Sequence, residues 1–157
     1  ADARIGQEMS ARLAAAKSPG LVEGPILQKG VTTMRGFVAE PLRHGRLFLA
    51  GDAAHIVPPT GAKGMNLALA DVLVLSRAIA AFYQSGGTEL LDNYSATCLR
   101  RVWKAQRFSG WMTQMLHRFN AADDFDYHRQ LAELDYVTTS PAAAKSLAEH
   151  YVGLPVE

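Results

Sequence analysis

The sequence has a single cysteine, Cys98, among its 157 residues. One cysteine cannot form a disulfide within the chain, so we expect a reducing compartment, the cytoplasm, by default. Cys98 lies on a helical pattern beside Leu99, Val102 and Trp103. Because free cysteine is among the most buried residue types, we predict a core thiol here rather than a nucleophile.

The chain also lacks an excess of charge of either sign. Lys and Arg number 16 and Asp and Glu 15, which leaves a net charge of +1. This balance provides no broad basic field of the kind that binds nucleic acid, so we expect no such partner. One basic cluster lies off the apolar positions of its helix: Arg100, Arg101, Lys104 and Arg107. A solvated helix face is favoured there over an anion site.

No apolar run reaches the length of a membrane span without a polar break. The longest candidate, residues 67–83, contains Asp71, Ser76 and Arg77. No basic segment precedes a short apolar core, so we expect neither a signal peptide nor a membrane partner. The sequence begins at Ala1 without an initiator Met, and we expect it to be part of a longer chain.

Hydrophobic periodicity predicts five helices, over residues 4–17, 66–83, 88–119, 127–136 and 140–150. The helix over 66–83 is apolar on most sides, so we expect it to be buried between two layers. Glycines at 86 and 87 stop it, and Thr88 is placed to cap the next helix. Ser140 followed by Pro141 is a typical start for the last one.

Two segments between the first two helices favour strands. Residues 31–42 show a loose strand pattern that Pro41 closes, and residues 43–45 form a turn. The short apolar run 46–51 fits a strand of a parallel sheet, buried on both faces.

The stretch that follows this run combines an acid with strong backbone constraints. Asp52 comes directly after the expected strand, where its carboxylate can accept hydrogen bonds from sugar or polyol hydroxyls. A loop stiffened by Pro58 and Pro59 then leads to a helix start, whose free N–H groups stabilise negative charge. A reduced flavin, with a polyol chain and an anionic ring edge, would suit both features. An acid that caps a local turn is the alternative.

Residues 51–71, GDAAHIVPPTGAKGMNLALAD, resemble the second flavin-binding motif of the class A flavoprotein aromatic hydroxylases. Residues 94–119 and 148–155 resemble the same family, so the similarity covers nearly the whole chain. The resemblance implies an α/β fold, or α+β for a piece of this length. It would comprise the end of a substrate-domain sheet, one buried strand with the flavin motif, and a mostly helical C-terminal region.

The resemblance implies three parts: the end of a substrate-binding domain over 1–45, the FAD-binding strand, loop and helix over 46–87, and a helical interface region over 88–157. The family's G-x-G-x-x-G turn for the ADP part of the cofactor is missing, since Gly6, Gly20 and Gly24 have the wrong spacing. We therefore expect the C-terminal part of a longer hydroxylase, which binds FAD weakly by itself.

The flavin contacts implied by the resemblance all lie in this motif. Asp52, with Gly51 beside it, would hydrogen-bond the ribityl hydroxyls of FAD. The backbone N–H groups of Gly64, Met65 and Asn66 would face the O2 and N1 edge of the flavin.

Catalytic roles are implied for Pro59 and Tyr151. The Pro59 carbonyl would accept a hydrogen bond from the phenol of the substrate and repel the phenolate, while Thr60 and Gly61 line the same loop against the flavin ring. Tyr151 would hydrogen-bond a second tyrosine that contacts the substrate hydroxyl. This relay would draw the proton off the phenol and activate the ring carbon ortho to it.

Three residues of the motif carry open alternatives. His55 has the chemistry of a base, but the motif places it behind the flavin, where a structural role is favoured. Lys63 either tunes charge near the flavin or faces water. Asp71 either pairs with a basic group in the missing part of the longer protein or caps locally.

The implied activity is that of an FAD-dependent, NADPH-using monooxygenase that acts as a homodimer and has no metal site. With O2 it would hydroxylate 4-hydroxybenzoate ortho to its phenol and give 3,4-dihydroxybenzoate. Lys63, where most of the family carries Gln, resembles the subgroup with this substrate. The alternatives are a related hydroxylase of another phenolic acid and a non-catalytic helical interaction fragment. The apolar face of the latter would comprise Trp103, Trp111, Met112 and Met115.

Overall fold

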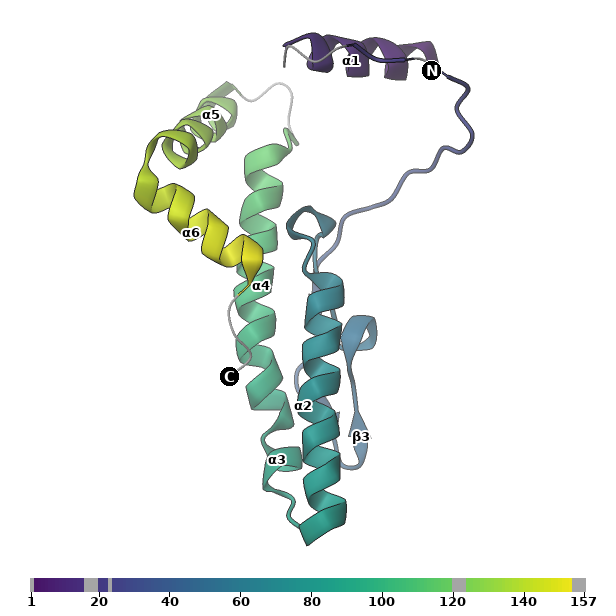
Figure 1. The fold of residues 1–157 in the computed structure, drawn as a ribbon, viewed down its shortest axis with the longest axis vertical. Helices are drawn as coiled ribbons and strands as arrows, with labels where there is room; N and C mark the ends of the chain where they lie inside the picture. The colour runs from purple at the N-terminus through teal and green to yellow at the C-terminus, as the bar shows by residue number, and fades with distance from the viewer. Residues whose placement is uncertain (1, 16–19, 23, 120–123, 154–157) are drawn as a thin grey trace. The chain divides into compact units, whose positions relative to one another are not determined.

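The structure is a computed structural model that describes residues 2–15, 20–22, 24–119 and 124–153 (Figure 1). It divides into two compact units, Ala1–Thr33 and Met34–Glu157. The described residues of the first unit include one helix, α1 (Asp2–Ala15), so the predicted helix is confirmed, while its expected end at residues 16–17 lies outside the described residues. The described residues from 20 to 33 form neither helix nor strand.

The second unit contains two small antiparallel sheets. Strands β1 (Phe37–Val38) and β4 (His55–Ile56) form one, and β2 (Arg43–His44) and β3 (Leu47–Phe48) form the other. Gly45, at φ +58°, lies in the tight turn between β2 and β3.

The predicted strands are therefore too long, and the expected parallel pairing of residues 46–51 is wrong. Only two residues of that run pair with a neighbour, on one side, and Leu47 remains 60% exposed. Local apolar composition does not determine which segment becomes the hydrogen-bonding partner.

Helix α2 (Gly64–Ser85) confirms the helix predicted over 66–83. Gly86 ends it in the left-handed conformation, at φ 74°, with its N–H bonded to the Phe82 carbonyl. The expected burial between two layers is wrong for the described residues, because α4 (Tyr94–Leu116) lies along one side of α2 (Figure 1). Apolar side chains elsewhere on α2 are exposed: Met65, Leu69, Val72, Leu73, Ile79, Phe82 and Tyr83.

By length and composition alone, α2 could cross a membrane. Its buried residues are Leu67, Ala70, Asp71 and Ala78, and they face the rest of this unit. The acidic side chain among them is held by hydrogen bonds to the protein, so in this structure α2 serves as a packing helix of the unit.

The single helix predicted over 88–119 is two helices, α3 (Glu89–Asp92) and α4, which meet at Asn93. Thr88 precedes α3 but makes no side-chain cap. Helices α5 (Asp124–Thr139) and α6 (Pro141–Val152) confirm the last two predictions, and α5 is longer than expected. Ser140 caps α6 as predicted, accepting a hydrogen bond from the Ala143 N–H at 3.4 Å.

Helix α4 contributes buried side chains to the core along its whole length. Its N-terminal half buries Tyr94 and Cys98 with Leu42 and Ala54, and its C-terminal half buries Phe108, Met112 and Met115 with Val137 of α5. Cys98 is 4% exposed, and burial raises the pKa of its thiol to about 12, which confirms the predicted core thiol.

The proposed apolar interaction face does not form. Met112 and Met115 are buried within the unit, whereas Trp103 is exposed and donates its indole N–H to Glu40 at 2.6 Å. Although the four side chains follow a helical spacing, they do not form one exposed apolar face. The mostly helical unit with few strands agrees with the expected α/β fragment, and the division at residues 45 and 87 remains a prediction.

Candidate functional site

The acid of the motif lies in a single turn of 3-10 helix, η1 (Gly51–Ala53), directly after the β2–β3 hairpin. Gly51 has φ +61°, a conformation that favours glycine, and a Cβ there would lie 3.3 Å from the Ala68 Cβ of α2. Asp52 is exposed. The turn therefore presents the carboxylate to solvent while its backbone lies close against α2.

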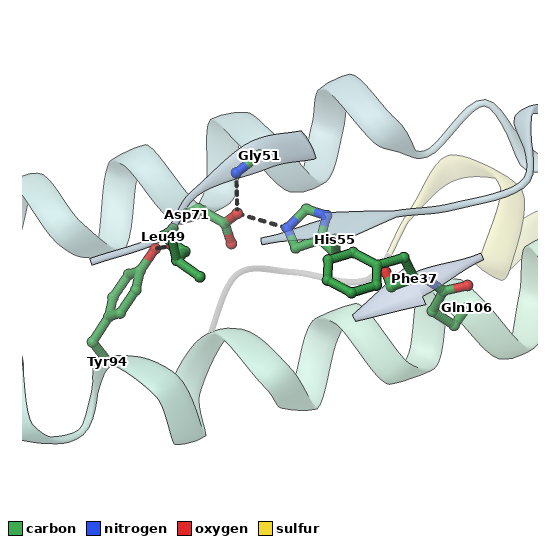
Figure 2. Close-up of polar contacts among 7 residues, drawn as sticks. All are labelled: Phe37, Leu49, Gly51, His55, Asp71, Tyr94 and Gln106. Carbon is green, nitrogen blue, oxygen red and sulfur yellow. Dashed lines mark hydrogen bonds and ion pairs between the residues drawn. The ribbon is translucent and has the colours of Figure 1, made fainter. Parts of the chain in front are cut away.

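A buried acid on α2 holds this turn in place. The Oδ2 atom of Asp71 accepts hydrogen bonds from the Gly51 N–H at 3.0 Å and from the His55 Nε2 at 2.7 Å (Figure 2). Asp71 is 2% exposed and His55 is 1% exposed. A ring so buried cannot meet a substrate, so the structural role favoured for His55 is confirmed. The partner of Asp71 in this chain is this imidazole, within the same motif, so the local cap is wrong, and a basic partner in the rest of the longer protein stays a prediction.

Two side chains of α4 hold the strands on either side of η1. The Tyr94 hydroxyl donates to the Leu49 carbonyl at 2.8 Å (Figure 2). The Gln106 amide donates to the carbonyls of Ile56 and Phe37 at 2.7 and 3.3 Å. Burial is the main cause that raises the pKa of Tyr94, so its hydroxyl remains protonated and able to donate.

The prolines lead into a second 3-10 turn, η2 (Pro59–Gly61). Ala62 follows in the left-handed conformation at φ 50° and donates its N–H to the Pro59 carbonyl at 2.9 Å. A carbonyl oxygen has two lone pairs, so the Pro59 oxygen retains acceptor capacity. Pro59 is exposed at this turn.

The η2 turn packs tightly against α4. Gly61 is buried, and a Cβ there would lie 2.5 Å from the Ser109 Oγ. Thr60 accepts a hydrogen bond from the Thr113 hydroxyl at 2.9 Å. The backbone of the turn is therefore fixed to α4 on its inner side, with Pro59 on the outer side.

Helix α2 starts directly beyond this turn, without a side-chain cap. Lys63 occupies the cap position but its side chain accepts no hydrogen bond, and the first N–H groups of the helix, at Gly64, Met65 and Asn66, precede any intrahelical acceptor. Met65 and Asn66 are exposed. The positive end of the helix dipole and these N–H groups form a place for an anionic or carbonyl-rich ligand edge.

Lys63 does not face water, which was one of its two expected roles. Its side chain is 7% exposed, and its ammonium donates to the Tyr151 carbonyl at 2.5 Å. The ammonium also lies 5.4 Å from the ring centroid of Phe108 and 5.6 Å from that of Tyr151. Burial, and then the charge of Arg101, lower the pKa of Lys63.

Lys63 links Tyr151, near the C-terminus, to the flavin motif by its hydrogen bond to the Tyr151 backbone. The Tyr151 ring is 56% exposed and packs edge-on against Phe108 at 6.5 Å. Its hydroxyl meets no second tyrosine within the described residues, so the proton relay remains a prediction. The same residues contain no group of His, Cys, Asp and Glu suited to a metal ion.

Sequence reasoning located the motif but missed the side chains that fix it. Tyr94, Gln106, Ser109 and Thr113 all lie on α4, far from the motif in sequence. Gln106 offered one signal, since it is a polar residue between the apolar positions Val102 and Phe108.

Known proteins are similar to this chain in sequence and in fold. Residues 1–109 match the family described as FAD binding domain. The p-hydroxybenzoate hydroxylase of Acinetobacter baylyi is 52% identical over 156 residues, which cover 99% of this chain and 39% of that protein. The 4-methyl-5-nitrocatechol 5-monooxygenase of a Burkholderia species is 35% identical over 136 residues, covering 76% of this chain and 24% of the relative.

A crystal structure of the p-nitrophenol 4-monooxygenase of Pseudomonas putida has a similar fold. It superposes with a TM-score of 0.63 at 21% identity, over 96% of this chain and 39% of that one. The chain thus spans about two fifths of the length of the A. baylyi relative and of this structure.

Proposed function

The chain belongs to the FAD binding domain family, and we propose on that premise that it forms one side of the active site of an FAD-dependent aromatic monooxygenase. The observation that carries the proposal is the uncapped start of α2 at Gly64–Asn66, set beside a turn that presents Asp52. The helix start offers N–H donors and positive charge, and the turn offers a carboxylate that accepts hydrogen bonds from hydroxyl groups. A flavin would use the first at its anionic ring edge and the second at its ribityl chain.

The residues present fit FAD. Gly51 lets the η1 turn lie close against α2, and Asp52, exposed on this turn, would hold the ribityl hydroxyls. The N–H groups of Gly64, Met65 and Asn66 would hold the O2 and N1 edge of the ring. When bound and reduced, the flavin would supply the chemistry that activates O2 for transfer of one oxygen atom to the substrate.

The substrate-facing steps fall to Pro59 and Tyr151. Pro59 is exposed, and its carbonyl accepts the Ala62 N–H but has a second lone pair, which would accept the hydrogen bond of a substrate phenol and orient it. The same carbonyl would repel the negative charge of the phenolate. It would thereby hold the substrate as the neutral phenol until the proton is taken up by the tyrosine relay. A second tyrosine, in contact with the substrate hydroxyl, would pass that proton on to Tyr151, whose backbone carbonyl is held by Lys63 of the motif.

We further propose 4-hydroxybenzoate as the substrate, 3,4-dihydroxybenzoate as the product and NADPH as the reductant. Support comes from the 52% identity to p-hydroxybenzoate hydroxylase across nearly the whole chain. A cytoplasmic homodimer is part of the same proposal. Another phenolic acid is the alternative substrate, since the 4-methyl-5-nitrocatechol 5-monooxygenase is also a relative.

The test uses the complete gene product that contains these 157 residues. NADPH oxidation is measured alone and with a panel of hydroxybenzoates and nitrophenols, and products are identified by chromatography. We expect 4-hydroxybenzoate to accelerate oxidation most and to appear as 3,4-dihydroxybenzoate. If a different phenol accelerates it most, the substrate assignment is wrong. If no phenol does, the proposed activity is wrong.

A further inference from the structure

A cavity lies beside the flavin motif, between α2 and α4, where residues at the end of α6 complete its lining. It has a volume of about 350 Å³, which suits a ligand of one ring. Its walls are largely apolar, formed by Leu69 and Leu73 of α2 and Phe108 of α4. Only Asn66 of the expected flavin contacts borders it.

The cavity is also basic. Lys63, Arg101 and Lys104 line it, and His150 stands at its rim with them. No Asp or Glu of the described residues lines it. An apolar cleft with basic side chains and no acid among its described lining residues repels metal ions and other cations and attracts anions.

Lys63 is the residue of the cleft whose charge most needs an anionic partner. Its ammonium is buried, it donates to a neutral carbonyl, and no described carboxylate lies within ion-pair distance of it. Burial of an ammonium without a counter-charge is costly, and the neighbouring Arg101 increases the cost. An anion in the cleft would offset both terms.

We propose that this cleft binds a small organic monoanion, a carboxylate or sulfonate with an apolar body. The charged head would contact Lys63 and Lys104, and the body would pack between α2 and Phe108. The cleft differs from the flavin site, whose expected contacts are backbone N–H groups and Asp52. It therefore does not depend on the proposed function.

The test probes the complete gene product with cyclohexanecarboxylate, whose saturated ring makes it unlike a phenolic substrate. Cyclohexylmethanol is the uncharged match and inorganic phosphate the anion without an apolar body. Binding is followed by calorimetry and located by amide NMR shifts. We expect the carboxylate to bind more tightly than either control and to shift signals around Leu73 and Phe108. Equal binding of cyclohexylmethanol or phosphate, or shifts elsewhere, would overturn the proposal.

Variants separate the cleft from general charge effects. Lys104→Gln removes a rim charge and should weaken binding about two- to fivefold, while Lys63→Met should weaken it more. Arg100→Gln is the matched control, since Arg100 is exposed on the same helix but does not line the cleft. Equal loss in Arg100→Gln and Lys104→Gln would also overturn the proposal, and circular dichroism checks that each variant is folded.

Discussion

The contact between Gly61 and α4 offers a sharp test of how the substrate-facing turn is held. A Cβ at position 61 would lie 2.5 Å from the Ser109 Oγ and 3.3 Å from both the Phe108 Cδ1 and the Ser109 Cα. Two of these three atoms belong to Ser109, which is fully buried. Neither the turn nor the helix can yield without breaking packing, so Gly61→Ala should force η2 away from α4.

The expected cost follows from overpacking. Insertion of one methyl group into a closely packed core costs about 1–3 kcal/mol, and the contact at 2.5 Å places Gly61→Ala toward the upper end of that range. The Ser109 hydroxyl is buried without a hydrogen-bond partner. Its removal alone, in Ser109→Ala, should therefore be neutral or slightly stabilising.

Urea unfolding of the two single variants and of the double variant measures the contact as a thermodynamic cycle. We expect the double variant to recover about 1 kcal/mol of the loss in Gly61→Ala, because the closest clash is removed. Gly110→Ala is the control: nothing lies within 4 Å of a Cβ there, and alanine should stabilise the helix by about 0.5–1 kcal/mol. A neutral Gly61→Ala, or strictly additive effects, would refute the packing argument.

Three further outcomes follow from the buried groups. Asp71→Asn keeps the shape of the side chain but places an amide against two donors, and should lower the unfolding free energy by about 2–3 kcal/mol in urea; a loss below about 0.5 kcal/mol would contradict the role of the carboxylate. Cys98 should resist thiol reagents in the native state, since a pKa raised from 9.0 to about 12 makes its thiolate roughly a thousandfold rarer, and rapid labelling without unfolding would show that the thiol is accessible. The pKa of Lys63 is lowered from 10.5, so below 10.5 the unfolded chain binds more protons at this site. The wild type should therefore gain stability relative to Lys63→Met as pH rises from neutral toward 10.5, with the full penalty present below the lowered pKa; parallel pH profiles of the two proteins would show that Lys63 is not desolvated.

Local signals predicted the elements well where one residue determines the outcome. Gly86 stops α2 and Ser140 caps α6, because each acts on its own helix end through backbone geometry or a single hydrogen bond. The core position of Cys98 followed from helical periodicity. In the motif, the order of acid, prolines and glycines predicted the turns around a helix start.

Long-range pairing was beyond local reasoning. The run 46–51 looks the same whether its partner is a parallel strand or the neighbouring hairpin strand. Asp71 and His55 each have several plausible partners, and only the fold brings them within 2.7 Å. The environment of Lys63 was equally beyond local reasoning, because α4 and a residue 88 positions later in the chain bury its side chain.

The central claim is that Asp52 and the start of α2 hold a flavin, and the FAD affinity of the complete gene product tests it most directly. Flavin fluorescence gives the dissociation constant for the wild type, for Asp52→Asn and for the control Asp135→Asn, an exposed acid of α5. Loss of hydrogen bonds to a charged group is worth about 1.5–3 kcal/mol, so Asp52→Asn should bind FAD roughly ten- to a hundredfold more weakly, while Asp135→Asn matches the wild type. Unchanged affinity in Asp52→Asn, or a wild type that binds no FAD, would contradict the claim.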